Sequence, residues 1–314
     1  MSKEVVDDSL FKPLQKDDKI ADDFMRPSIS VFRESVINII KNKMAVIGFV
    51  LIVLIFFLAI FGPLMAPYGH SEQVLEDANS PPSAEHWFGT DDLGRDMWVR
   101  TWLGARVSLT VGLAATLIDI IFGVVVGGIA GYAAGRGKVG DRIDGFLMRL
   151  IEVLYGIPYL LVVILLLVVM EPGMLTIIIA LAATGWVGMA RIIRGQVLQL
   201  STQDYVLAAQ KLGTPHWKII TRHLWPNTLN IIIVNLSFTI PTAIFSEAFL
   251  SFIGLGVQAP FASWGTMAND ALSVIFSGEW WQLFFPGLLI SITMFAFNIF
   301  GDGVQDALDP SMKK

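Results

Sequence analysis

Hydrophobic residues in this chain are gathered into long runs that are separated by polar segments. An apolar helix of about 20 residues crosses the roughly 30 Å hydrocarbon core of a bilayer. The runs lack the alternation of strands, and a spanning segment must satisfy its own backbone hydrogen bonds. The sequence therefore predicts six transmembrane helices, the fourth being the shortest in apolar length. The predicted spans are Ala45–Ala66, Leu109–Tyr132, Phe146–Met170, Met174–Ile193, Leu229–Phe252 and Leu283–Phe300.

Lysine and arginine predict the orientation of these spans. With the N-terminus inside, all but three of the 22 basic residues fall in cytoplasmic segments, and only Arg95, Arg100 and Arg106 fall outside. Cytoplasmic loops carry such an excess of basic residues, so we predict an N-in, C-in topology. The expected division is a cytoplasmic arm (1–44), a first span (45–66), an external loop (67–108), a five-helix core (109–304) with a cytoplasmic loop (195–227) and an external loop (253–282), and a cytoplasmic tail (305–314).

Composition agrees with a membrane protein. Of the 314 residues, 54% are hydrophobic and 16% are charged, with a net charge of −5. Soluble domains carry about 25% charged residues. The charge gives no reason to expect nucleic-acid binding. The absence of cysteine excludes disulfides and thiolate metal sites, and the four histidines lack metal-ligand spacing. The polar N-terminal arm is expected to be mobile, apart from a surface helix over Ser28–Asn42.

Four glycines in the second span recur every fourth residue and therefore share one helix face. They are Gly123, Gly127, Gly131 and Gly135. Small residues at this spacing let another helix approach closely within a membrane. We predict a packing seam, which could be filled by a helix of this chain or of a partner.

Three acidic residues fall at membrane depth, where a charge costs about 2.5–3.5 kcal/mol on insertion scales. Glu152 follows Arg149 by three residues and is expected to pair with it. Glu247 is expected near the external surface. Asp119 is a candidate for facing a water-filled path or a partner subunit, with a locally satisfied structural role as the equal alternative. Three scattered acids do not form a proton relay.

The polar segment between the fourth and fifth spans predicts a helical elbow. Gly213 can adopt the left-handed conformation that ends a first short helix. Thr214 is then the N-cap of a second helix, with Pro215 at its first position. Pro226 is expected to end that helix, and the fifth span is expected to follow it.

The elbow is expected to expose the small residues Ala208 and Ala209, which suits insertion into a cleft on another protein. The alternative is an amphipathic helix lying on the lipid surface. The segment resembles the signature loop of ABC-importer permeases, Glu-Ala-Ala, three residues, Gly, nine residues, Ile-x-Leu-Pro. The matching positions are Ala208, Ala209, Gly213 and Pro226, and the departures are Leu207, His223 and Trp225.

Two further blocks carry a more specific resemblance. His86–Asp96, continuing through Gly104–Leu109, is similar to the segment after the first span in C-type permeases of oligopeptide and dipeptide importers. Glu247–Gln258 and Ser263–Gly265 resemble the external loop after the fifth span of that family. The resemblance extends from the first span to the C-terminal Leu-Asp-Pro run. It implies the all-α fold of an ABC type I importer permease in a bacterial cell membrane.

The resemblance also implies a non-catalytic transport subunit. Gly135–Val139 lacks the spacing and the hydroxyl residue of a nucleotide-binding loop, so ATP and Mg²⁺ would be held by partner subunits and no cofactor by this chain. The implied partners are a homologous second permease, two cytoplasmic ATPases, an extracytoplasmic peptide-binding protein, membrane lipid and the peptide. Relatives in the family carry nickel, glutathione or haem-like cargo, so the resemblance implies the transport class rather than a peptide length.

Two sets of residues follow from this reading. The elbow would be the coupling helix that docks into an ATPase. Its expected residues are Leu207, Ala208, Ala209, Gly213, Thr214, Pro215 and Pro226. Candidate contacts to the binding protein are Asp92, Arg95, Asp96 and Trp264. For the charged residues, a local salt-bridge network is the equal alternative. A secondary transporter, a channel or a scaffold would also fit the composition, and dependence on ATP and a binding protein separates these classes.

Overall fold

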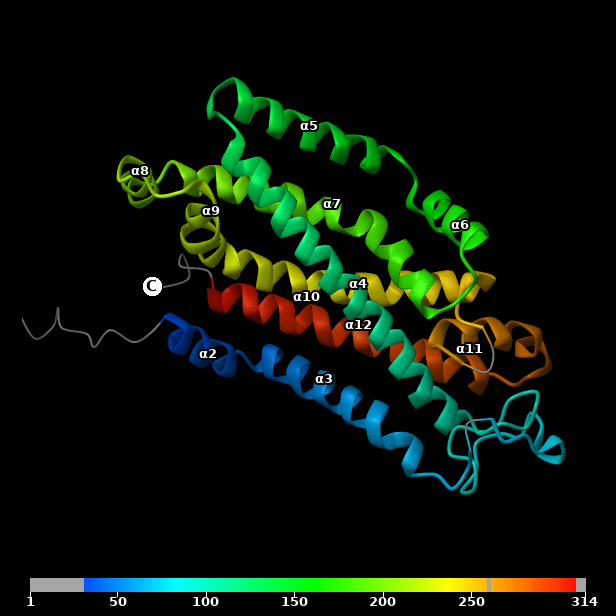
Figure 1. Cartoon of the computed structure of the whole chain (residues 1–314). Helices are drawn as coiled ribbons and strands as arrows, with labels where there is room; N and C mark the ends of the chain where they lie inside the picture. The colour runs from blue at the N-terminus through cyan, green and yellow to red at the C-terminus, as the bar shows by residue number, and fades with distance from the viewer. Residues whose placement is uncertain (1–30, 70, 259–260, 309–314) are drawn as a thin grey trace, which may run out of the picture.

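The computed structural model describes residues 31–69, 71–258 and 261–308. Helices dominate these ranges, which contain no strand beyond an isolated bridge between Thr90 and Asp96 (Figure 1). The α-helices are α2 (Val31–Lys41), α3 (Lys43–Phe61), α4 (Met97–Ala133), α5 (Gly137–Gly156), α6 (Tyr159–Val169), α7 (Met174–Ser201), α8 (Asp204–Lys211), α9 (His216–Ile219), α10 (Trp225–Leu250), α11 (Trp264–Asp270) and α12 (Trp281–Leu308).

Five helical segments are long and apolar enough to cross a membrane. They are Lys43–Leu64, Met97–Ala133, Met174–Ser201, His216–Leu255 and Trp281–Leu308. The third predicted span is not one helix: α5 and α6 meet at an angle of 85°, a geometry that fits a broken span or a re-entrant loop. Pro158 explains the break: it has no N–H to donate, and it favours an extended residue before it. Ile157 is extended, with ψ 124°.

Two helix ends differ from the sequence-based expectation. Helix α4 begins at Met97, inside the predicted external loop, because the Asp96 carboxylate accepts a hydrogen bond from the N–H of Val99 and caps the helix. The expected stop at Pro226 is wrong. A π-helical turn, Ile220–Leu224, joins α9 to α10, and Pro226 lies in the first turn of α10, where a missing N–H costs little.

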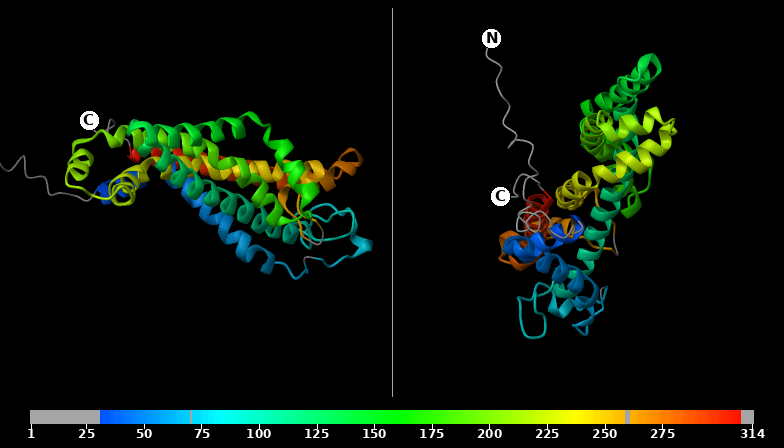
Figure 2. Two further views of the ribbon diagram at one scale, coloured as in Figure 1. Left: turned by 45° about the horizontal axis from the view of Figure 1, so that its top comes forward. Right: turned by 90° about the vertical axis from the view of Figure 1, so that its left-hand side faces the viewer.

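The helices form one elongated bundle. Helix α4 lies along α7 and also contacts α10, whereas α12 lies between α3 and α10. The α5–α6 pair lies on one side of the bundle and α2–α3 on the opposite side (Figures 1 and 2). One end carries α2, α8 and α9, and the other carries α11 and the loop before α4. The distribution of lysine and arginine predicts that the first faces the cytoplasm. We call these the cytoplasmic end and the outer end.

The glycines of α4 face α7. A Cβ atom at Gly123, Gly127 or Gly131 would lie within 3.0 Å of Met189, Ala190 or Arg194, so the seam is filled by a helix of the same chain. Gly135 is not part of this contact, contrary to the expectation from its spacing. It lies beyond the end of α4 in a left-handed conformation, φ 73°, with no neighbour within 4 Å of an added Cβ.

The helix predicted over Ser28–Asn42 is present as α2, whose described range is Val31–Lys41, and its position on the membrane surface stays a prediction. Its first expected residues, the arm before them and the tail 309–314 lie outside the described residues. The side chain of Asn42 accepts hydrogen bonds from the N–H groups of Met44 and Ala45. This cap separates α2 from α3 and sets the start of the first span.

Candidate functional site: the cytoplasmic elbow and the outer polar network

The elbow ends α8 as its sequence predicts. Gly213 has φ 74°, and the N–H of Thr214 bonds back to the carbonyl oxygen of Ala209 at 3.0 Å. A β-carbon would be strained in this conformation, which explains the glycine. Helix α9 begins one residue later than expected, at His216. Pro215 is its N-cap residue, and Thr214 makes no side-chain cap.

The elbow buries one face and exposes another. Val206 and Ala209 pack in a cluster with Ile219, so Ala209 is not exposed as the sequence suggested. The exposed side carries Leu207 with Leu212, which is 85% exposed. Ala208 and Trp217, the latter 64% exposed, are also accessible. Pro226 is exposed at the base of α10.

The exposed apolar residues Leu207, Leu212 and Trp217 define what we call the elbow patch. Sequence reasoning found Leu207 through the signature alignment but missed Leu212 and Trp217. A signal was available, because the inward face is set by the i, i+3 pair Val206 and Ala209. An apolar surface of this kind at the polar end of a membrane protein fits a protein contact.

A hydrogen bond ties the elbow to α4. The hydroxyl of Tyr132, in the last turn of α4, lies 2.9 Å from Nδ1 of His216 in α9. The guanidinium of Arg136 lies 3.8 Å from the centre of the Tyr132 ring. Nearby, the Cα of Gly128 faces the Trp225 indole of α10. The elbow therefore contacts α4 through a named pair of side chains, and α4 in turn contacts the start of α10.

A salt bridge joins α5 to α7. Arg194 donates two hydrogen bonds to Asp144, from Nε at 2.6 Å and from a terminal nitrogen at 2.7 Å. This bidentate geometry is the strongest form of an arginine–carboxylate pair. It fixes α5 against α7.

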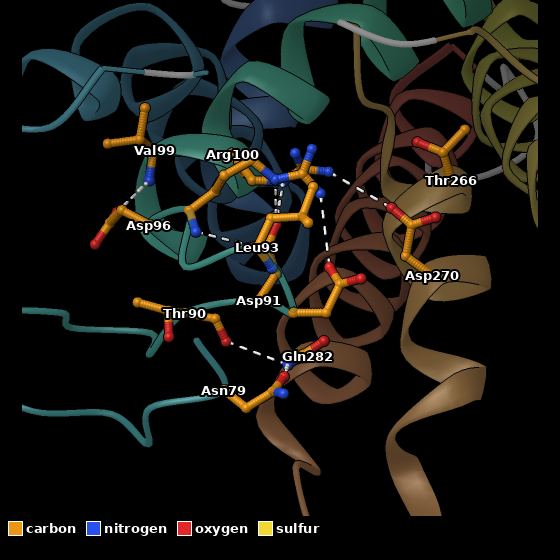
Figure 3. A network of polar contacts seen from close by, with 12 residues as sticks. Asn79, Thr90, Asp91, Leu93, Asp96, Val99, Arg100, Thr266, Asp270 and Gln282 are labelled. Atoms are coloured by element: carbon orange, nitrogen blue, oxygen red, sulfur yellow. Dashed lines mark hydrogen bonds and ion pairs between the residues drawn. The ribbon is translucent and has the colours of Figure 1, made fainter. Parts of the chain in front are cut away.

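At the outer end, Asp91 is the centre of a polar network (Figure 3). Its carboxylate accepts hydrogen bonds from the N–H groups of Leu93 at 3.0 Å and Arg95 at 2.9 Å. The same carboxylate contacts Nε of Arg95 at 2.7 Å and Nε of Arg100 at 3.2 Å. Asp270 of α11 lies 3.5 Å from Arg100. The network thus joins the loop before α4 to α4 and α11.

The four residues proposed as binding-protein contacts fall into two groups. Asp96 is buried, with its carboxylate 2.8 Å from Nδ1 of His86, and Trp264 is fully buried, with Nε1 donating to the carbonyl of Thr101. These two side chains are enclosed in this chain and cannot reach another protein. Arg95 is engaged by Asp91, whereas Asp92 is exposed and stays a candidate contact.

The acidic residues at membrane depth have different surroundings. Asp119 is buried between α4 and α7 against Gly185, and its Oδ1 has no hydrogen-bond partner. Glu247 is also fully buried within this chain and accepts a hydrogen bond from Ser251 at 2.7 Å. Its expected position near the external face stays a prediction. Glu152 is exposed, and no ion pair joins it to Arg149. Within the described residues, no cluster of His, Asp or Glu could hold a metal ion.

Comparisons with known proteins bear on the whole chain. Residues 123–314 match the family described as "Binding-protein-dependent transport system inner membrane component", and residues 30–82 match "N-terminal TM domain of oligopeptide transport permease C". A dipeptide transport system permease protein, DppC of Bacillus subtilis (strain 168), is 54% identical over 98% of this chain and 95% of its own length. The oligopeptide permease protein OppC of the same organism is 48% identical over 98% of both chains.

A solved structure supports the fold. A chain of the MetNI methionine ABC transporter, in an inward-facing conformation, superposes with a TM-score of 0.51 over 67% of this chain and 94% of that chain. Its 15% sequence identity restricts the likeness to the fold. The five long apolar helices and the family matches agree on a multi-pass membrane protein. The chain belongs to the family of inner-membrane components of binding-protein-dependent transport systems.

Proposed function

We propose that this chain is the transmembrane permease subunit of an ATP-driven, binding-protein-dependent importer of oligopeptides or dipeptides. It would form half of the translocation path together with a homologous second permease. The observation that carries the proposal is the near full-length similarity to DppC and OppC proteins, which includes the elbow and the outer loops. The chain would supply the path, while two cytoplasmic ATPase subunits would bind ATP and Mg²⁺.

The elbow patch is the proposed docking surface for an ATPase subunit. Leu207, Leu212 and Trp217 would enter an apolar cleft, and burying them would release water from apolar surface at about 25 cal/mol per Å². Closure of the ATPases on binding ATP would then displace the elbow. Helix α9 continues through the π-helical turn into α10, and His216 holds Tyr132 of α4. Both connections favour transmission of that displacement to the spans.

Reconstitution tests the function directly. The full complex, with the second permease and both ATPases, is placed in liposomes and supplied with binding protein and a tritiated dipeptide such as Ala-Phe. Uptake is expected only when ATP is accessible to the ATPases and the binding protein is on the opposite side. Uptake driven by an ion gradient without the ATPases would instead support a secondary transporter. A matched complex with a hydrolysis-deficient ATPase serves as the control.

A further inference from the structure

Two hollows adjoin at the outer end of the bundle. The larger has a volume of about 750 Å³, and the smaller of about 330 Å³. Both lie within or near the size range of small-ligand sites, about 300–1,000 Å³. They share Arg100, Val257, Gln258 and Phe261 in their linings. They are therefore neighbours, which we call two compartments, and Arg100 lines both.

The two compartments differ in chemistry. The larger is lined mainly by apolar side chains, among them Leu103, Val107 and Met174. The smaller is polar and is lined by Thr266, Asn269 and Asp270 in addition to the arginines. Sites for small molecules usually combine an apolar cavity with a few convergent polar groups. Such a site suits a molecule that has both an apolar and a polar part.

Arg100 is buried at the junction but is incompletely bonded. The residue is 7% exposed, and its Nε lies 3.2 Å from the carboxylate of Asp91 without the direction of a hydrogen bond. Asp91 is already engaged by Arg95 and by two backbone N–H groups. A buried donor without an acceptor is costly, and the guanidinium fork matches a carboxylate in two parallel bonds.

Asp270 is a weak counter-ion for Arg100. Its carboxylate lies 3.5 Å from the guanidinium, and its side chain is 51% exposed. Partial burial raises the pKa of the Asp270 carboxyl above its ordinary value, and the positive charge of Arg100 opposes that rise. A half-exposed ion pair at this distance contributes little stability. Another carboxylate could therefore replace Asp270 at Arg100.

The charge balance of the network selects among anions. Three carboxylates, those of Asp91, Asp92 and Asp270, lie near Arg95 and Arg100, and a third arginine, Arg106, lines the larger hollow. This charge balance gives no advantage to a dianion such as phosphate. It favours a molecule whose single carboxylate is accompanied by an ammonium group, because a displaced Asp270 could accept that ammonium.

We propose that these two hollows form a receiving site for the C-terminal carboxylate of a short zwitterionic peptide. Arg100 binds the carboxylate in place of Asp270, and the adjacent side chain of the peptide enters the apolar compartment between Leu103 and Phe261. This inference rests on the proposed function and names a site within it. A peptide released by the binding protein at the outer end of the bundle would thus bind to this chain before it moves between the spans.

Equilibrium binding to the intact complex tests the site. The complex of both permeases and both ATPases is placed in nanodiscs without nucleotide or binding protein, and tritiated Ala-Phe is titrated against its C-terminal amide. Wild type should bind the acid at least about tenfold more tightly than the amide, corresponding to about 1.4 kcal/mol. Arg100→Gln should remove this preference, and Arg100→Lys should retain part of it. Arg142→Gln, which removes an exposed arginine at the cytoplasmic end, should behave as wild type.

Asp270→Asn provides a second variant that keeps the buried arginine. Removing the competing carboxylate should tighten binding of the acid several-fold and leave binding of the amide unchanged. Equal binding of acid and amide by wild type, no loss in Arg100→Gln, or displacement of the peptide by lipid acyl chains alone would overturn the inference. ATP-driven uptake by wild type is measured in parallel. If wild type takes up peptide but binds the acid and the amide equally, the proposed site is wrong and the proposed function stands. If ATP does not drive uptake, the proposed function is wrong.

Discussion

Tyr132 and His216 are 84 residues apart in the sequence, and their side chains are joined by a hydrogen bond of 2.9 Å. Tyr132 lies at the cytoplasmic end of α4, the helix whose glycines pack on α7. His216 opens α9 at the elbow. The bond therefore connects the segment that would contact an ATPase with the most extensively packed span of the bundle.

Replacing Tyr132 with phenylalanine tests this connection. The ring and its contact with Arg136 remain, while the hydrogen bond, worth about 1 kcal/mol, is lost. We expect peptide uptake per ATP hydrolysed to fall several-fold, with normal assembly of the complex. Tyr155→Phe, at a 69% exposed position of α5 away from the elbow, is the control and should have no effect. An unchanged ratio of uptake to hydrolysis in Tyr132→Phe would show that the bond does not transmit the movement.

Gly213→Val should distort the elbow. The backbone at Gly213 has φ 74°, and a β-branched residue there costs on the order of 1–3 kcal/mol. The expected result is uncoupling: ATPase stimulation by loaded binding protein and peptide uptake both decrease, while membrane insertion is retained. Gly213→Asn is the control, since asparagine tolerates the left-handed conformation. Normal stimulation and uptake in Gly213→Val would count against the elbow as the coupling element.

Leu212→Ser tests the elbow patch without disturbing the fold, because this side chain is 85% exposed. If Leu212 enters a cleft on an ATPase, losing its apolar contact weakens that association by about 1–3 kcal/mol. Co-purification or fluorescence titration of the ATPase measures the change. Leu75→Ser makes the same substitution at a 70% exposed leucine of the outer end and should leave ATPase binding intact. Equal effects of the two substitutions would mean that the patch is not a docking surface.

The hydrophobic pattern predicted the five helices that are long enough to cross a membrane, because each is an apolar run of membrane length. The same pattern could not predict the bend between α5 and α6, since apolar residues continue across Pro158 and only the backbone geometry reveals an 85° turn. The glycine seam on α4 was predictable from the glycine spacing, but the residue at which the seam ends was not. Gly135 satisfies the period and yet lies past the last helical residue, Ala133.

Site residues were harder to predict because exposure depends on tertiary packing. Ala209 matches the family signature, but its place in the elbow turns it toward Ile219. Trp264 lies in an external segment and is nevertheless enclosed by α4 through its bond to Thr101. The position of Asp91 between two arginines required the loop to fold back onto the start of α4. A sequence motif identifies such residues but cannot say which of them face a neighbour.

Gly127→Leu should destabilise the bundle at the α4–α7 seam. An added Cβ would meet the backbone of Ala190 closer than 3.0 Å, and backbone atoms cannot rotate away as a flexible side chain can. Forcing the helices apart costs about 1–3 kcal/mol and removes the surrounding contacts. Thermal unfolding of the complex in nanodiscs should show a Tm several degrees below wild type, with uptake reduced in parallel. Gly145→Leu on α5 is the matched control, because an added Cβ there meets nothing within 4 Å and should leave the Tm unchanged. A Gly127→Leu complex as stable as the control would mean that α4 and α7 can separate at little cost, and the seam would then be a sliding surface rather than a fixed joint.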